Sequence, residues 1–195
     1  MHKNKNYHAG NFPQIHLFDT VKANLASKND VLQSENKPVK YVFFILEGIV
    51  REHLIFNDGR DINITFWSAP ALIGSIFNCE PGTNANTSLS MLTSGKYRKI
   101  PIELFLKQIG KDQRGIHCVN DILETQNHWL RKRSLLLSHK NAEDRVKDFA
   151  LTFPGLYKVI PDYHIASYLG ITPVTMHRAK TKLSNNNNFA QTLSK

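Results

Sequence analysis

The spacing of apolar residues changes near Lys111, and this change limits the fold more than any other feature of the chain. Residues 39–100 hold short apolar runs separated by Gly, Pro and Asn-Asp-Gly turns, which is typical of strands. Beyond Lys111, apolar residues recur at near-helical or heptad spacing, which indicates helix. The sequence therefore predicts an α+β protein in which a β-domain at 1–110 precedes a helical part.

The β-domain is expected to be a roll. Residues 57–60, Asn-Asp-Gly-Arg, predict a tight hairpin turn, because Asp-Gly supplies the positive φ that such a reversal requires. The strand DINITFW follows, with Ile62, Ile64 and Phe66 on one face and Asn63 and Thr65 on the other. Many short strands with regular turns predict a sandwich or a jelly-roll-like double-stranded β-helix.

Residues 111–139 predict one long helix with a narrow apolar seam. The seam consists of Ile116, Val119, Leu123, Gln126, Leu130 and Leu137. Such a seam favours a partner helix, and a second copy of the same helix is the simplest partner. The alternative is that the seam packs on the chain's own β-domain. We interpret RKRS at 131–134 as a solvated face rather than a phosphate site.

The C-terminal part, 140–195, predicts a small helical domain. Asn141 is placed to cap a helix that runs to about Phe153, and FPGLYKVIP at 153–161 reads as a short connection. The stretch HIASYLGITPVTMHRAKTKL at 164–183 then has the spacing of a helix-turn-helix that begins at Asp162. Its expected inward positions are Ile165, Ala166, Leu169, Ile171, Met176, Ala179 and Leu183.

Three residues give this motif its local mechanics. Gly170 can adopt the left-handed conformation that turns the chain sharply between the two helices. Thr172 is placed to cap the second helix, and Pro173 falls at its first position, where a missing N–H does no harm.

The outward face of the second helix carries Val174, Thr175, His177, Arg178, Thr181 and Lys182. A helix at 172–185 with such a face has the geometry that enters the major groove of DNA. The alternative is an αα-hairpin with a charged surface. Charge favours the first interpretation: residues 111–195 hold 13 Lys/Arg against 7 Asp/Glu, while residues 1–110 hold 12 against 9.

Composition excludes several classes of protein. No apolar run reaches 18 residues, and MHKNKNYHAGNF lacks the apolar core of a signal peptide, so we expect a cytoplasmic protein that does not enter a membrane. Cys79 and Cys118 alone cannot form a four-thiolate zinc or iron–sulfur site. No catalytic residues, metal ligands or cofactor site are expected.

At this point the chain resembles the Crp/Fnr family of bacterial transcription regulators, as a short and divergent member. IASYLGITPVTMHRAKTKL is close to that family's helix-turn-helix, and YVFFILEGIVREHL with NDGRDINITFWSAPALIG resembles its cyclic-nucleotide-binding-type roll. The resemblance implies an effector domain at 1–110, a dimerisation helix at 111–139 and a DNA-binding domain at 140–195. The implied partners are a pseudo-palindromic double-stranded DNA, a second copy of the chain and, further, RNA polymerase.

The resemblance also implies roles for single residues. Thr172 and Thr175 match positions that touch the DNA backbone, and Arg178 matches an arginine that reads a base edge, most simply a guanine. His177, Thr181 and Lys182 are candidates for further contacts. Pro173 and Val174 stand where relatives carry Arg and Glu, so direct readout should be narrower or rely on Val174 against a thymine methyl.

The implied effector pocket contains Gly74, Ser75, Ile76, Asn86 and Thr87. Relatives that bind cyclic AMP carry a Glu after the glycine and an Arg for the cyclic phosphate, but this chain reads Gly-Ser-Ile and TNANTSL there. A phosphate buried without its bidentate arginine is unfavourable, so we expect that cyclic AMP is not the ligand. The effector stays unidentified.

Two other functions stay open at this stage. The chain could bind a cyclic nucleotide or another small ligand and have a degenerate DNA-binding end. An enzyme built on a roll, such as a metal oxygenase, needs two His and a carboxylate at close spacing, and Glu52 and His53 have no second His nearby. The expectation is therefore a regulator and not an enzyme.

Overall fold

The computed structural model describes residues 16–74, 83–111 and 113–185. These residues form two compact units, and each is described by itself. Unit 1 contains residues up to Leu54 together with Thr65–Asn127, and unit 2 contains Ile55–Ile64 together with residues from His128 onward. The division 1–110, 111–139 and 140–195 stays a prediction. The sequence pattern did not reveal that the turn around residues 55–64 belongs with the C-terminal helices.

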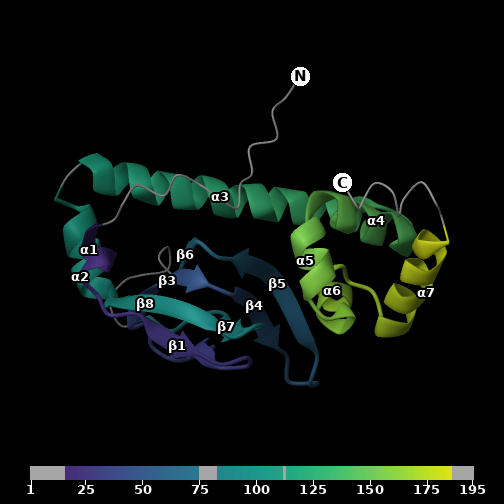
Figure 1. Ribbon diagram of the computed structural model, residues 1–195, viewed down its shortest axis with the longest axis horizontal. Coiled ribbons are helices and arrows are strands. Elements are labelled where there is room, and N and C mark those ends of the chain that lie inside the picture. Colours follow the sequence, from purple (N-terminus) through teal and green to yellow (C-terminus); the bar gives the residue numbers. More distant parts are fainter. Residues whose placement is uncertain (1–15, 75–82, 112, 186–195) are drawn as a thin grey trace. The chain divides into compact units, whose positions relative to one another are not determined.

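Two four-stranded antiparallel sheets build the roll (Figure 1). The first has the strand order β1, β8, β3, β6 and the second the order β2, β7, β4, β5. Their bounds are β1 Asn24–Ala26, β2 Val31–Gln33, β3 Tyr41–Glu47, β4 Ile49–Ile55, β5 Asp61–Ser68, β6 Ala71–Ile73, β7 Ser88–Met91 and β8 Gly95–Pro101. The α+β fold class predicted from the change of period is confirmed.

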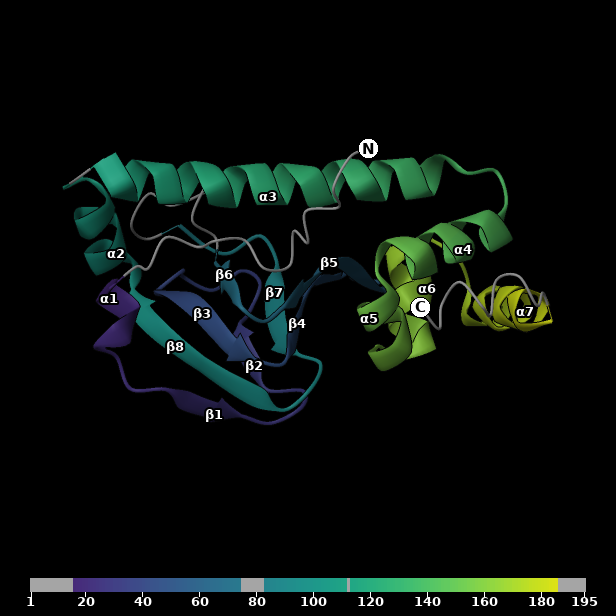
Figure 2. The same cartoon turned by 45° about the horizontal axis from the view of Figure 1, so that its top comes forward.

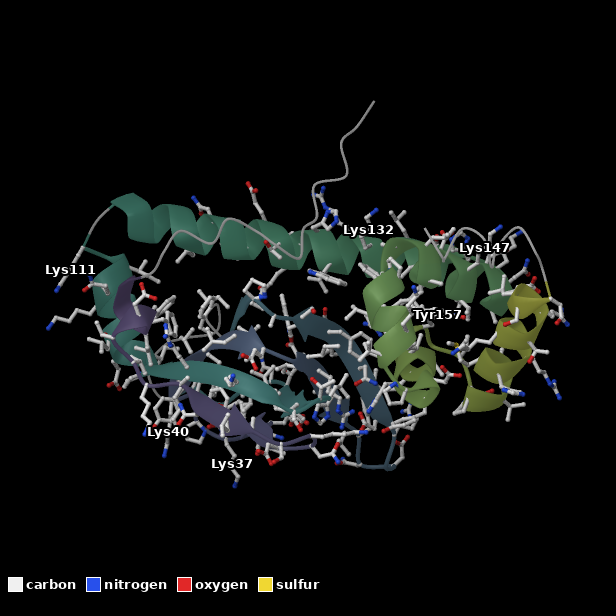
Figure 3. All side chains as sticks on the ribbon, in the orientation of Figure 1. Lys37, Lys40, Lys111, Lys132, Lys147 and Tyr157 are labelled. Atoms are coloured by element: carbon white, nitrogen blue, oxygen red, sulfur yellow. The ribbon has the colours of Figure 1, made fainter. Side chains whose placement is uncertain are left out.

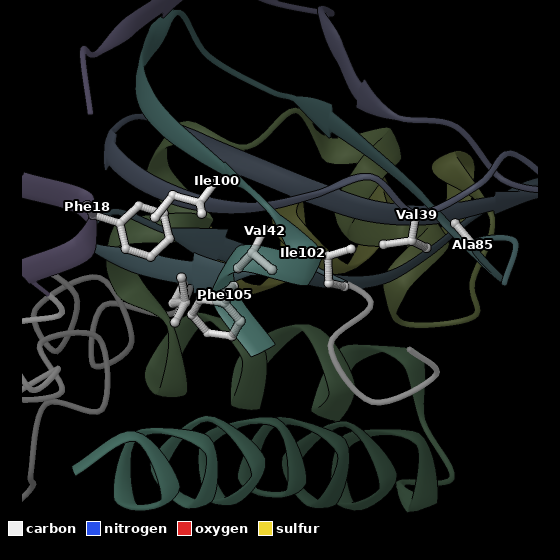
Figure 4. Packing of buried hydrophobic residues seen from close by; sticks show 8 residues of the cluster. Phe18, Val39, Val42, Ala85, Ile100, Ile102 and Phe105 are labelled. Atoms are coloured by element: carbon white, nitrogen blue, oxygen red, sulfur yellow. The ribbon is translucent and has the colours of Figure 1, made fainter. Parts of the chain in front are cut away.

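An apolar cluster closes one end of the roll (Figure 4). It joins strand residues to the short helices α1 (His16–Asp19) and α2 (Ile102–Ile109). Its members are Phe18, Val39, Val42, Leu72, Ala85, Ile100, Ile102 and Phe105. The Phe18 and Phe105 rings lie 6.3 Å apart, centroid to centroid. This cluster fixes α2, from which the chain continues into the long helix.

The turn between β4 and β5 forms as predicted. Gly59 has φ +84°, and the N–H of Phe56 donates to the carbonyl of Arg60 at 2.9 Å. The hydrogen bond from Arg60 lowers the pKa of the Asp58 carboxyl. On β5, the two faces alternate as predicted, but the polar face is the more deeply buried. Asn63 is 0% exposed and Thr65 is 6% exposed.

Within the described residues, five helices follow α2 (Figure 2). They are α3 Gln113–Ser138, α4 Ala142–Thr152, α5 Pro154–Val159, α6 Asp162–Tyr168 and α7 Pro173–Ser184. The long helix predicted from the heptad spacing is present as α3, and α4 begins after Asn141 and ends before Phe153, as expected. The predicted connection FPGLYKVIP is instead the short helix α5, because Pro154 at its first position pre-sets a helical φ.

Aromatic packing forms the core of unit 2. The rings of Trp129 and Phe153 stack with centroids 4.5 Å apart, and Phe149 meets both Phe153 and Tyr168 edge-on. These contacts join the C-terminal part of α3 to α4 and α6. Among the residues that the structure describes, no helix has the length and apolar character to cross a membrane.

Candidate nucleic-acid interface

The turn between α6 and α7 has the geometry that its sequence predicted. Gly170 adopts φ +63°, a conformation that side-chain-bearing residues rarely take. The N–H of Ile171 then donates to the carbonyl of Ala166 at 3.0 Å. This closes α6, and only four residues separate it from the start of α7.

Thr172 caps α7. Its Oγ1 accepts a hydrogen bond from the N–H of Thr175 at 3.1 Å, and Pro173 occupies the first helical turn. The two hydroxyls, Thr172 Oγ1 and Thr175 Oγ1, lie 2.9 Å apart and share one hydrogen bond. Each hydroxyl has one hydrogen, so one hydrogen of the pair can still be donated to an outside acceptor at the N-terminus of α7.

One face of α7 is fixed by burial. Met176 is 0% exposed, and Ala179 and Leu183 are each 4% exposed, so their side chains anchor α7 on the neighbouring helices α4 and α6. Ile165 and Ala166 of α6 are fully buried, and so is Leu169, which directly follows α6. The predicted inward positions are therefore inward, except that Ile171 is half-buried.

Two arginines hold the carbonyl groups at the end of α6. Arg133 of α3 donates from Nε to the carbonyl of Tyr168 at 3.2 Å, and Arg145 of α4 donates from Nη1 to the carbonyl of Leu169 at 3.1 Å. Arg133 also lies over the Tyr168 ring. The interpretation of residues 131–134 as a solvated face was thus wrong for Arg133, since its heptad position turns it toward α6.

Burial changes the pKa of both partners in that contact. Burial lowers the pKa of the Arg133 guanidinium. Burial also raises the pKa of the Tyr168 phenol to about 12, an effect that the nearby Arg133 charge opposes. The ring and the cation are therefore a packed pair, and this pair supports the helix-turn-helix from the side of α3.

The outward face of α7 is open to solvent. Its exposed predicted residues are Thr172, Val174, His177, Arg178, Thr181 and Lys182, and Thr175 is half-buried. All seven thus lie on one helix or at its cap, and none belongs to the core. Val174 is 61% exposed, so its methyl groups face solvent near the N-terminus of α7.

Some hydrogen-bonding capacity on this face is already used. Thr181 Oγ1 donates to the carbonyl of His177 at 3.0 Å, so its hydrogen is spent within α7. Lys182 Nζ lies 3.4 Å from Glu143, and both side chains are largely solvated, so this ion pair is weak and DNA phosphate can compete with it. Arg178 therefore offers the most donors on the face.

Lys180 differs from its neighbours because it faces α5 and α6. Its Nζ lies 2.7 Å from the Asp162 carboxylate and 4.8 Å from the Tyr157 ring centroid. Tyr157 belongs to α5 (Figure 3). Burial, with the nearby Asp162 charge, raises the pKa of Tyr157. Lys180 is thus a packing contact within unit 2, consistent with its omission from the predicted reading residues.

Sequence reasoning missed the N-terminus of α4. Lys140, Asn141 and Glu143 line an open cleft of about 700 Å³, together with Thr175, Arg178 and Lys182 of α7. The Asn141 side chain does not cap α4 but donates to Asp144 Oδ2 at 3.0 Å. Lys140, a basic residue just before the expected start of α4, was the one sequence signal for this cleft. Sequence spacing alone does not show that the start of α4 lies beside α7.

The predicted effector pocket is partly described. Ser75 and Ile76 lie outside the described residues, Gly74 is half-buried and Asn86 is exposed. Thr87 Oγ1 donates to Glu52 Oε1 at 2.8 Å, and Trp67 Nε1 donates to Glu52 Oε2 at 3.3 Å. Glu52 lies opposite Leu89 in the β4–β7 ladder. A carboxylate in contact with Thr87 disfavours a second negative charge at that place.

His53, the other residue considered for chemistry, has a structural contact. Its Nε2 lies 2.9 Å from Ser90 Oγ, and both residues are buried. In the part of the chain that the structure describes, no group of three or more His, Cys, Asp and Glu side chains is arranged to hold a metal ion.

Comparison with known proteins gives one related sequence and many related structures. The chain is 27% identical over 168 residues to the transcriptional activatory protein AadR of Rhodopseudomonas palustris, covering 79% of this chain and 67% of AadR. FixK2 from Bradyrhizobium japonicum superposes with a TM-score of 0.73 at 21% identity, covering 85% of each chain. No family model matches the chain.

A second solved structure has a similar fold. A protein from Eubacterium rectale assigned to the Crp/Fnr family of transcriptional regulators superposes with a TM-score of 0.69 at 14% identity, covering 86% of this chain and 80% of that one. A roll, a long helix and a capped helix-turn-helix in this order are the Crp/Fnr architecture. The chain is therefore of the Crp/Fnr type in its fold, as the resemblance implied.

Proposed function

We propose that this chain is a transcription regulator of the Crp/Fnr type that binds double-stranded DNA through α7. One observation carries the proposal: α7 is anchored by buried Met176, Ala179 and Leu183 while Arg178 and His177 on the opposite face are exposed. A helix held in this way presents its polar face as a rigid unit, which is what readout of base edges in the major groove requires. The AadR relative, named a transcriptional activatory protein, supports it.

The residues on α7 divide between phosphate and base contacts. The hydroxyl pair Thr172 and Thr175 at the helix N-terminus can donate one hydrogen to a phosphate oxygen, where the helix dipole favours negative charge. Arg178, one turn further along, reads a guanine through O6 and N7. Val174 contacts a thymine methyl, and Lys182 exchanges Glu143 for phosphate. The phosphate contacts set the register of the protein on the duplex, and the base contacts distinguish one sequence from another.

A homodimer through residues 111–139 belongs to the same proposal. Leu130 lies on the predicted seam of α3 and is 53% exposed in the single chain, so a second copy of α3 has apolar surface to cover. Two reading helices related by a two-fold axis match a pseudo-palindrome whose half-sites are about one helical turn apart. Such a protein works in the cytoplasm, and an activator would in addition contact RNA polymerase.

The roll is proposed to receive a signal other than cyclic AMP. The Glu52 carboxylate accepts a hydrogen bond from the hydroxyl of Thr87, one of the predicted pocket residues. An incoming cyclic phosphate would then meet a carboxylate instead of an arginine, and like charges at close range are unfavourable. This supports a regulator with a divergent effector site rather than a cyclic-nucleotide-binding protein with a degenerate end.

Selection from a random pool of duplexes tests the proposal. Full-length protein should enrich a pseudo-palindromic site, and its affinity should fall steeply with salt because phosphate contacts release counterions. Enrichment of a single half-site would contradict the homodimer. No enrichment over the starting pool, with correctly folded protein, would contradict the proposed function.

A further inference from the structure

The turn between β4 and β5 contacts α6, the first helix of the helix-turn-helix, although about a hundred residues separate the two in sequence. Residues 55–64 belong to unit 2, the same compact unit as α4, α5, α6 and α7. The backbone N–H of Asn63 donates to Ser167 Oγ at 3.0 Å, and Ser167 Oγ donates to the carbonyl of Asp61 at 2.7 Å. One hydroxyl on α6 thus bridges two backbone groups of the turn.

The side chain of Asn63 adds two more hydrogen bonds. Its Nδ2 donates to the carbonyl of His164 at 3.2 Å and lies 3.2 Å from His164 Nδ1. The backbone carbonyl of His164 can only accept, so the Asn63 amide must point its NH₂ group toward His164. His164 Nδ1 is then the acceptor of the second hydrogen bond. Asn63 is 0% exposed and His164 is 6% exposed. Buried polar groups are unfavourable without partners, so this contact has one specific geometry.

The contact supports the reading helix without covering it. His164 and Ser167 lie on α6, which packs against α7. Between them in sequence, Ile165 and Ala166 are fully buried. The outward residues of α7, including Arg178, stay exposed in the same unit. A contact that fixes α6 and leaves the reading face open positions that face for binding and does not block it.

We propose that Asn63 and Ser167 are positioning residues for DNA recognition, and that the β4–β5 turn is a built-in part of the reading head. This inference rests on the proposed DNA-binding function. Loss of the contact lets α6 and α7 take other orientations, which lowers the fraction of protein competent to bind.

The test compares Ser167→Ala with Ser167→Thr and with the control Ser138→Ala in the full-length chain. Ser167→Ala removes both hydroxyl bonds, and Ser167→Thr keeps the oxygen. Ser138 donates only within α3, to the carbonyl of Leu135. Affinity for the duplex selected with wild type is measured by fluorescence anisotropy, well below the melting temperature of every variant. Global unfolding then cannot account for a difference.

We expect Ser167→Ala to bind the selected duplex about tenfold more weakly, which is a loss of about 1.4 kcal/mol. Ser167→Thr and Ser138→Ala should bind like wild type, and Asn63→Ala should weaken binding at least as much as Ser167→Ala. Wild-type or tighter binding by a folded Ser167→Ala would overturn the positioning role. Failure of wild type itself to bind any duplex would instead overturn the proposed function and, with it, this role.

Discussion

Arg145 of α4 donates from Nη1 to the carbonyl of Leu169, at the point where α6 ends and the chain turns toward α7. The same guanidinium donates from Nε to the carbonyl of His139, where α3 has ended and α4 has not yet begun. One side chain therefore joins the turn that precedes α4 to the turn that follows α6. The planar fork of arginine suits two diverging bonds, and a lysine ammonium would not reproduce this geometry.

Replacing Arg145 with Met should destabilise unit 2. The substitution keeps the apolar stem but leaves two carbonyl groups without their charged donor, and hydrogen bonds to charged groups contribute about 1.5–3 kcal/mol each. We expect the free energy of unfolding by urea to fall by about 3 kcal/mol, the lower end of the range for two such bonds. Lys147→Met is the matched control, because Lys147 is exposed on the same helix (Figure 3). Equal effects of the two variants would exclude the role given to Arg145.

Leu130→Glu should convert a dimer into monomers. A charge on the predicted seam of α3 would be buried without a partner between two helices. Leu135→Glu is the matched control: Leu135 is 62% exposed on the same helix but lies off the seam. Light scattering should give a monomer mass for Leu130→Glu alone. A monomeric wild type, or a dimeric Leu130→Glu, would contradict dimerisation through α3.

Cyclic AMP should leave the melting temperature of the protein unchanged. A ligand at a hundred times its Kd stabilises a protein by about 2.7 kcal/mol, a shift that scanning fluorimetry resolves easily. Because Glu52 holds Thr87 in the predicted pocket, we expect no saturable shift at millimolar nucleotide. A saturable rise would show that the pocket accepts the cyclic phosphate despite the carboxylate.

The phenol of Tyr168 should make the fold sensitive to alkaline pH. Its pKa is about 12 in the folded state against an ordinary value of 10.0, so the folded state keeps its proton to higher pH than the unfolded chain does. Stability then falls as pH rises from 10 toward 12. Between about pH 9 and about pH 11.5, Tyr168→Phe should lose about 2 kcal/mol less than wild type in urea unfolding. Parallel losses in the two proteins would contradict the buried phenol.

Local chemistry explains which parts of the helix-turn-helix could be predicted from the sequence. Gly170 and Thr172 act through their own backbone and immediate neighbours, so a turn and a cap can be read from short sequence spacing. The burial of Met176 and Ala179 follows from helical periodicity in the same way. The fold class was predictable because the hydrophobic period changes once along the chain.

Contacts between distant segments could not be predicted. Asn63 was predicted only to lie with Thr65 on one face of its strand, and its full burial against α6 was not foreseen. Arg133 looked solvated, yet it holds the carbonyl of Tyr168. In both cases the partner lies at least 35 residues away in sequence, and no periodicity encodes such a pairing. The short helix α5 was missed because six residues carry too little pattern to distinguish a helix from a connection.

Discrimination by Arg178 tests the central claim most directly. Affinities of wild type and Arg178→Ala are measured for the selected duplex and for a scrambled duplex at one salt concentration. Arg178 is exposed, so the variant should fold normally but lose about 1–3 kcal/mol of discrimination between the two duplexes. Lys158→Ala, an exposed residue of α5, should discriminate like wild type. Discrimination that is unchanged in Arg178→Ala would contradict base readout by α7.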